Sequence, residues 1–186
     1  MAELEFHPVT SERWGDLETL FGPNGACAGC WCMWWRVTRS EWERRRGEGN
    51  RSALKRIVDS GEVPGILAYS EDRPVGWCSV GPREAFPVLQ RSRVLKPLDG
   101  EPVWSIVCFF VAKGSRRKGM TVELIDAAVD YARSRGARIV EGYPVVPAGM
   151  NMTWAYTGVE SAFLKAGFQV VARPSARRLI VRRHTG

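Results

Sequence analysis

The segment VAKGSRRKGMT, from Val111 to Thr121, joins the most apolar stretch of the chain to its longest helical pattern. A helix that starts here presents the N–H groups of its first turn to solvent, and its dipole adds a partial positive charge. Arg116, Arg117 and Lys118 add full positive charges, and Gly119 lets the backbone approach a ligand closely. The segment therefore indicates an anion site between a strand and a helix.

The sequence on both sides of this loop predicts one strand–helix–strand unit. Val103–Ala112 contains no charged residue, which is typical of a buried strand. Residues 121–136 carry apolar side chains at helical spacing and end in a glycine, as helices often do. Arg138–Tyr143 then predicts a second strand. In a single sheet such a unit forms a right-handed crossover between parallel strands.

The N-terminal part of the chain predicts a strand followed by helices. Leu4 and Phe6 alternate with polar residues at positions 3, 5 and 7 until Pro8 ends the pattern, and residues 10–21 take up helical spacing. Ser40 and Glu43 have the spacing of a capping box, in which each side chain satisfies an N–H group at a helix start. We expect Asn50 to cap the next helix.

The remaining sequence predicts a hairpin, a long connection and a terminal pair of strands. Residues 65–70 and 74–80 flank a polar turn and predict two antiparallel strands. Residues 82–102 contain four prolines, which break both helices and strand ladders, so we expect a surface excursion. The chain is predicted to end with one helix and two strands, at residues 157–166, 168–172 and 178–183.

The composition favours a single domain over residues 1–186, because 45% apolar residues in 186 suffice for one core. The N-terminus lacks the basic and apolar pattern of a secretion signal. The longest apolar run, Trp104–Ala112, is about half of the roughly 20 residues that a membrane helix needs. We therefore expect a cytoplasmic protein with no membrane span, whose five cysteines remain thiols. The net charge of +7 suits an anionic partner.

Arg116, Gly119 and Thr121 match the motif Q/R-x-x-G-x-G/A, apart from the last position, where smaller residues are usual. With this motif, with Ala166-Gly167-Phe168 before the last hairpin, and with its order of strands and helices, the chain resembles the GNAT superfamily of acyl-CoA-dependent N-acyltransferases. The resemblance implies a mixed α/β (α+β) single-domain fold, with a central twisted mixed sheet of about seven strands flanked by helices.

The resemblance also implies a site for acetyl-CoA, used as co-substrate without a metal. The diphosphate would rest on backbone amides of the loop, and the pantetheine arm would pair like an extra strand where the fourth and fifth strands splay apart. A backbone N–H near Val111 would stabilise the oxyanion. The implied contact residues are Phe109, Phe110, Val111, Arg116, Arg117, Lys118, Gly119, Met120 and Thr121.

The acid and base positions of the family are not matched. A protonated amine must lose a proton before it attacks, but Trp104–Ala112 contains no carboxylate. Glu141 on the next strand is the first substitute as general base; its alternative is a salt-bridged strand residue. The usual tyrosine of the last helix is replaced by Phe163, so Tyr156 is the candidate acid, and Tyr143 is a more distant one.

The stretch CAGCWCMWWR, from Cys27 to Arg36, allows three interpretations. Cys27, Cys30 and Cys32 could supply zinc ligands, but no second pair follows at finger spacing. A thioredoxin-like redox role lacks the expected context. In the GNAT fold this region forms one side of the acceptor pocket, where tryptophans suit an amine. We therefore assign no metal and expect a wall, part core and part acceptor site, formed by Trp31, Trp34 and Trp35.

The sequence thus predicts an N-acetyltransferase that moves an acetyl group from acetyl-CoA to a primary amine by direct attack. The acceptor, a small molecule or a protein amine, is not identified. One alternative is a non-catalytic acyl-CoA-binding sensor. Another is a basic nucleic-acid-binding module that uses Arg177, Arg178, Arg182 and Arg183, against which the absence of a recognisable binding motif weighs. The terminal strands offer a route to a homodimer.

Overall fold

The computed structural model describes residues 3–147, 149 and 155–186. One seven-stranded sheet with the order β1-β2-β3-β4-β5-β7-β6 forms its centre. Only β4 and β5 pair in parallel, so the sheet is mixed, as predicted. The strands are β1 (Leu4–Pro8), β2 (Gly65–Ser70), β3 (Arg73–Pro82), β4 (Trp104–Val111), β5 (Ile139–Gly142), β6 (Gln169–Ser175) and β7 (Arg178–His184).

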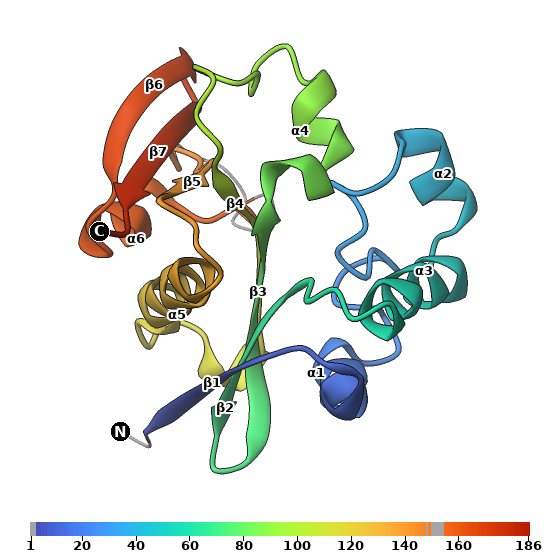
Figure 1. Ribbon diagram of the computed structural model, residues 1–186. Coiled ribbons are helices and arrows are strands. Elements are labelled where there is room, and N and C mark those ends of the chain that lie inside the picture. Colours follow the sequence, from blue (N-terminus) through green and yellow to red (C-terminus); the bar gives the residue numbers. More distant parts are fainter. Residues whose placement is uncertain (1–2, 148, 150–154) are drawn as a thin grey trace.

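Helices cover both faces of the sheet (Figure 1). One face carries α1 and α3 and buries Leu17, Leu54 and Trp77, while the other carries α5 and α6 and buries Leu124 and Phe163. Burial of these apolar faces is the main source of stability. The helices are α1 (Trp14–Phe21), α2 (Arg39–Arg44), α3 (Glu48–Asp59), α4 (Pro87–Arg91), α5 (Met120–Ser134) and α6 (Glu160–Lys165), with 3-10 turns η1 (Ser11–Arg13), η2 (Arg83–Ala85) and η3 (Lys113–Ser115).

The crossover from β4 through α5 to β5 is confirmed, and the two strands part soon after they meet. They pair only from Trp104 to Ile106 on β4, opposite Val140 to Gly142. On its other side β4 carries an extra residue, Val107, at a register shift against β3. Such a bulge bends a strand and increases its twist. The second half of β4 therefore runs away from β5 and leaves one edge without a strand partner.

Two predicted helix caps are wrong. The sequence TRSEWE contains two overlapping capping patterns, and the earlier one is used: Thr38 Oγ1 accepts from the Glu41 N–H at 3.3 Å, and the Glu41 carboxylate accepts from the Thr38 N–H at 3.0 Å. Ser40 lies inside α2. Asn50 also lies inside a helix, α3, where it is buried and donates to the carbonyl of Gly29 at 3.1 Å. It links α3 to residues 27–36, called the Cys/Trp segment below, instead of capping the helix.

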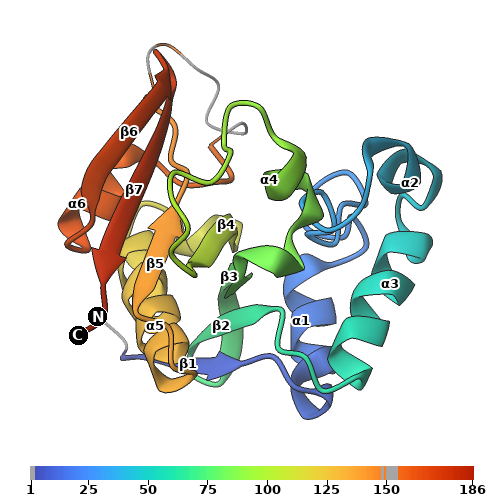
Figure 2. The same ribbon diagram turned by 45° about the horizontal axis from the view of Figure 1, so that its top comes forward.

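The predicted surface excursion is partly wrong, because the strap (residues 83–103) is anchored in the core. Phe86 and Leu89 of the strap are fully buried. The buried guanidinium of Arg83 donates to the carbonyls of Leu89 and Leu95 and, at 3.1 Å, to the Glu141 carboxylate. Figure 2 shows the strap leaving β3, forming α4 and running beside β5 and β7 before β4 begins. The sequence had suggested only a loop, since prolines hide the periodicity of its apolar residues.

The last helix is also shorter than predicted, since α6 begins at Glu160 and not at residue 157. Among the described residues, no helix has the length and apolar character needed to cross a lipid bilayer.

We predict that Arg83→Met lowers the free energy of unfolding by about 3 kcal/mol, because it removes one partner of a buried ion pair and two carbonyl contacts. Urea denaturation measures this change. Arg93→Met is the matched control, since Arg93 lies in the same strap but is exposed, and we expect a change within about 0.5 kcal/mol. Equal effects of the two substitutions would contradict the anchoring role of Arg83.

Candidate functional site

The loop from Val111 to Thr121 has the backbone of an anion cradle. After η3, Arg117 (φ +64°) and Gly119 (φ +83°) adopt left-handed conformations, and α5 begins directly at Met120. A non-glycine residue pays a conformational cost in this region, and such cost is often stored at functional sites. Within the described chain, no side chain caps the start of α5. The N–H groups of its first turn therefore lack a side-chain acceptor and suit a bound anion.

The side chains of the loop leave this cradle open and positive. Arg117 and Lys118 are exposed, and a Cβ atom placed on Gly119 would meet no atom within 4 Å. Arg116 turns back, and its Nε donates to the Val111 carbonyl at 2.9 Å. The Met120 side chain is buried, so only its backbone can face a ligand. Open space, free amides and three cations together fit a diphosphate.

The backbone geometry along the free edge of β4 indicates which of the predicted residues can contact a pantetheine arm. The Phe109 N–H points to this edge but already donates to the Tyr156 carbonyl at 2.7 Å. Phe110 pairs with Trp77 of β3, so its backbone groups face the opposite way. Val111, two residues beyond Phe109, directs its N–H to the free edge. Of the three predicted residues, Val111 is therefore the one whose amide is placed to receive a ligand.

Glu141 is enclosed by positive and hydroxyl donors. Its side chain is 1% exposed. One carboxylate oxygen accepts from Arg83 at 3.1 Å and from the Tyr143 hydroxyl at 2.8 Å, and the other accepts from Arg182 at 2.7 Å. Tyr143 is equally buried, and burial together with the Glu141 charge raises its pKa. This geometry favours the alternative of a salt-bridged strand residue over the general base predicted for Glu141.

We predict that Glu141→Gln lowers the free energy of unfolding by about 3 to 5 kcal/mol, because Arg83 and Arg182 lose a shared counter-charge. Turnover per folded molecule should stay within about threefold, since a structural role leaves the barrier almost unchanged. Denaturation and steady-state kinetics at a temperature where the variant is folded separate the two effects. A turnover loss of about 100-fold or more in folded protein would instead support a general base.

Tyr156 lies beside the free edge of β4, where its carbonyl binds the Phe109 amide. Its ring centre is 6.5 Å from that of Trp35. Burial raises the pKa of the Tyr156 hydroxyl to about 12, so the hydroxyl holds its proton at neutral pH. The neighbouring Arg178 acts in the opposite direction, but its effect is smaller. The structure thus brings Tyr156 and Val111 to the same part of β4.

Phe163, which occupies the family's tyrosine position, is fully buried. Its ring sits against two glycines. A Cβ atom on Gly142 would lie 2.3 Å from the ring atom Cε1, and one on Gly158 would lie 2.7 Å from Cε2. Phe109 and Phe168 make edge contacts with the same ring. This ring fills the core between β5 and α6.

The three predicted wall residues have different surroundings. Trp31 is 5% exposed and stacks on Trp14, with ring centres 6.0 Å apart, so its ring belongs to the core. Trp34 is partly exposed and meets Trp42 edge-on at 5.3 Å. Trp35 is close to Tyr156, and its buried indole N–H has no hydrogen-bond partner among the described residues. The acceptor role predicted for these residues is best placed at Trp34 and Trp35.

The cysteines next to these tryptophans pack as thiols. Trp42 donates its indole N–H to Cys30 at 3.4 Å, and Trp77 donates to Cys32 at 3.1 Å. Cys32 also lies 3.5 Å from Cys108 of β4, measured between sulfur atoms. Burial raises the pKa of Cys30 to about 11. In the described part of the chain, no three histidine, cysteine or acidic side chains are grouped to hold a metal ion.

We predict that the protein loses stability as the pH rises from about 9 to about 11. The pKa of Cys30 is higher in the folded chain, about 11, than its ordinary value of 9.0, so folding favours the protonated thiol. This contribution is complete below pH 9 and disappears as the pH passes the folded pKa. Urea denaturation at several pH values should show a smaller alkaline loss for Cys30→Ser than for the parent protein. Parallel curves would contradict the assignment.

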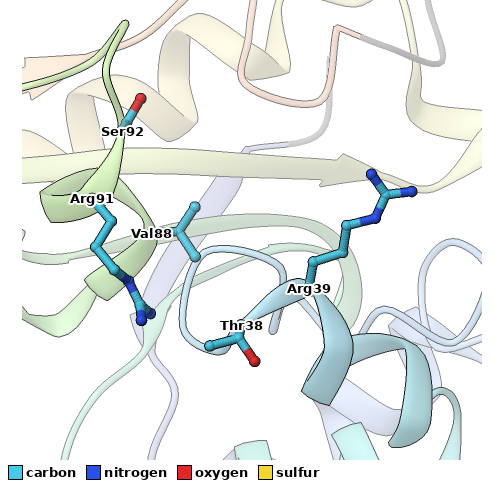
Figure 3. A pocket seen from close by; sticks show the side chains of 5 residues that line it. All are labelled: Thr38, Arg39, Val88, Arg91 and Ser92. Carbon is cyan, nitrogen blue, oxygen red and sulfur yellow. The ribbon is translucent and has the colours of Figure 1, made fainter.

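Two cavities lie near the Cys/Trp segment and apart from the loop. The first, of about 390 Å³, lies between α2 and α4, where Val88 separates the side chains of Arg39 and Arg91 (Figure 3). Thr38 and Ser92 complete its lining. The second, of about 410 Å³, lies among α3, the end of α2 and the beginning of the strap. Neither cavity is lined by any residue from Val111 to Thr121.

The basic residues of the terminal hairpin mostly serve the fold. Arg178 donates to the Tyr143 carbonyl at 2.7 Å, and Arg182 pairs with Asp99 at 2.6 Å as well as with Glu141. Arg183 pairs with Asp126 of α5 at 2.6 Å. These internal pairs remove three of the four arginines that the nucleic-acid alternative requires as a free surface.

Comparison with known proteins agrees with this geometry. The sequence model of the acetyltransferase (GNAT) family matches residues 31–147, and the chain belongs to this family. No curated protein matches the chain. Among solved structures, the fold is similar to a GNAT-family acetyltransferase from Listeria monocytogenes, with a TM-score of 0.58, 10% identity, and coverage of 98% of this chain and 95% of that chain.

Two further structures have the same fold. An N-acetyltransferase from Staphylococcus aureus Mu50 gives a TM-score of 0.57 at 10% identity, covering 100% of both chains. The PaiA N-acetyltransferase from Thermoplasma acidophilum, solved in complex with coenzyme A, gives 0.54 at 11% identity, covering 98% of this chain and 99% of that chain. These matches confirm the predicted fold class.

Proposed function

We propose that this chain transfers the acetyl group of acetyl-CoA to a primary amine. Membership of the acetyltransferase family supports the reaction class. The observation that carries the proposal is the uncapped start of α5, with Gly119 in a left-handed conformation and three cations around it. It lies at the end of the strand whose free edge leads to Tyr156.

The residues present fit coenzyme A. The amides of Met120 and Thr121 would hold the diphosphate, Arg117 and Lys118 would neutralise its charge, and the Val111 N–H would face the thioester end. When bound, acetyl-CoA supplies an acetyl group activated as a thioester. The preformed amides are already oriented, so they need no rearrangement when negative charge develops on an oxygen nearby.

The site contains a group suited to donate a proton, but its carboxylate is already hydrogen-bonded on both oxygens. Tyr156 holds a proton at its hydroxyl oxygen throughout the neutral range, because its pKa is raised to about 12. It is therefore suited to donate a proton and not to accept one. Glu141 has no oxygen without a donor. We propose that the acceptor amine, with an ordinary pKa of about 10.4, loses its proton to solvent before it attacks.

The acceptor would approach from the side of the Cys/Trp segment. The face of Trp34 can attract a cationic amine, and the unpartnered indole N–H of Trp35 can donate to a polar group of the acceptor. Because Trp35 lies against Tyr156, an acceptor held there would be close to the proton donor.

A non-catalytic acyl-CoA sensor is the second candidate. It is favoured by the enclosed carboxylate of Glu141 and by the buried phenylalanine at the usual acid position, Phe163. Both candidates bind acetyl-CoA, and turnover with a panel of amines distinguishes them.

We predict that isothermal titration will show acetyl-CoA binding in the micromolar range, and that Gly119→Glu will abolish it. The new side chain would enter the open space above α5 and add negative charge opposite the diphosphate. Gly136→Glu is the matched control, since Gly136 is also unobstructed and also has a positive φ, but lies just beyond the other end of α5. Absence of binding by the folded parent protein would contradict the proposed function.

If the chain is an enzyme, Tyr156→Phe should lower kcat by about 100-fold while acetyl-CoA affinity stays unchanged, because only a proton donor is removed. Kinetics with a saturating amine and titration with acetyl-CoA measure the two quantities. An unchanged kcat would leave water as the proton donor and exclude Tyr156 from that role.

A further inference from the structure

The second cavity has a lining that the acetyl-CoA site does not explain. It lies on the face of the sheet that carries α1 and α3, whereas α5 and the loop before it pack on the other face (Figure 1). It is an open surface depression with a volume of about 410 Å³. Apolar side chains form much of the wall: Met33, Val37, Ala53, Ile57, Ala85 and Pro87.

Three arginines contribute to the same wall, against one acidic residue. Arg36, Arg45 and Arg56 line the cavity together with Glu62. Arg45 makes only a 3.7 Å contact with Glu41, and Arg56 forms no ion pair with any residue that the structure describes. A concave site with apolar walls and excess positive charge favours an anion that carries hydrocarbon.

Arg36 is the decisive residue, because its guanidinium is buried and two of its three nitrogens have no hydrogen-bond partner among the described residues. Its side chain is 5% exposed and lies over the Phe86 ring at 4.7 Å. Nη1 donates to Glu62 at 3.0 Å, but Nε and Nη2 have no hydrogen-bond partner among the described residues and are shielded from water. Leaving charged donors buried and unpaired is costly.

The unused donors have a defined geometry. Nε and Nη2 form one edge of the planar guanidinium, whose two N–H bonds point the same way and match the two oxygens of a carboxylate. Burial lowers the pKa of Arg36, as expected for a cation that has too little counter-charge. Glu62 reaches the same guanidinium from the cavity wall and is itself half exposed, so the region already accommodates one carboxylate.

We propose that this cavity binds a small organic carboxylate, with its hydrocarbon body on the apolar wall and its charged group on Arg36 and Arg56. Because this unpaired edge is buried, binding requires the Arg36 side chain to move toward the ligand. The ligand would then supply the missing acceptor, and Arg56 would add charge at the entrance. This site is separate from the acetyl-CoA site and does not depend on the proposed function.

The test is isothermal titration with acetate, butanoate, hexanoate and octanoate, with octanamide and inorganic phosphate as comparison ligands. We expect saturable binding that strengthens roughly threefold per methylene group and is absent for octanamide. Inorganic phosphate should bind far more weakly than octanoate, because it cannot use the apolar wall. No saturable binding by any carboxylate, or equal binding of octanamide or phosphate, would overturn the proposal.

Variants locate the binding. Arg56→Gln, at an exposed position, should weaken octanoate binding about threefold or more, and Arg36→Lys, which keeps the charge but loses the paired donors, about tenfold. Glu62→Gln removes the competing carboxylate and should tighten binding. Arg44→Gln is the charge-matched control, because exposed Arg44 lies outside the cavity.

A further pair of titrations tests whether the carboxylate site is distinct from the proposed acetyl-CoA site. Gly119→Glu should leave octanoate binding unchanged, whereas Arg56→Gln should leave acetyl-CoA binding unchanged. Octanoate affinity that is insensitive to Arg56→Gln, and also to Arg36→Lys in folded protein, would place the ligand elsewhere and refute the proposal.

Discussion

The separation of β4 from β5 is the constraint on which the rest of the site depends. Only three residue pairs hold these parallel strands together before the bulge at Val107 turns β4 away. A parallel pair that continued would use the β4 edge for backbone hydrogen bonds. Because it stops, the edge meets the Tyr156 carbonyl and then opens at Val111, next to the start of α5. The loop before α5, the Val111 amide and Tyr156 are neighbours for this reason.

The short contact between β4 and β5 has to be stabilised by other means. Glu141 of β5 lies opposite Ser105 of β4 in this contact. Its carboxylate forms ion pairs with Arg83 of the strap and Arg182 of β7. Because these charges are buried, the Glu141 carboxylate and the two arginines must neutralise one another, since an unpaired buried charge would be costly. The network links segments that are distant in the sequence, and it gives both oxygens of the Glu141 carboxylate a hydrogen-bond donor.

Much of the fold could be predicted from the sequence, because the strands and the helix α5 have clear periodicity and the loop between β4 and α5 has an unambiguous chemical character. The errors fall where local patterns compete. Thr38 and Ser40 both begin capping patterns, and only packing decides between them. The strap resembles an excursion in the sequence because its prolines hide the periodicity of buried residues such as Phe86 and Leu89. The roles predicted for Glu141 and Trp31 stay predictions. Their surroundings come from distant segments, which spacing alone does not reveal.

Phe163 is tightly packed in the core between β5 and α6. Its ring is confined between Gly142 and Gly158, and its far end faces the backbone of β5. An oxygen attached to that end would lie against the backbone of Gly142. The place that Phe163 occupies therefore leaves little room for a tyrosine hydroxyl. Tyr156, which does carry a hydroxyl, belongs to a segment whose backbone is hydrogen-bonded to β4, so its placement is coupled to that strand.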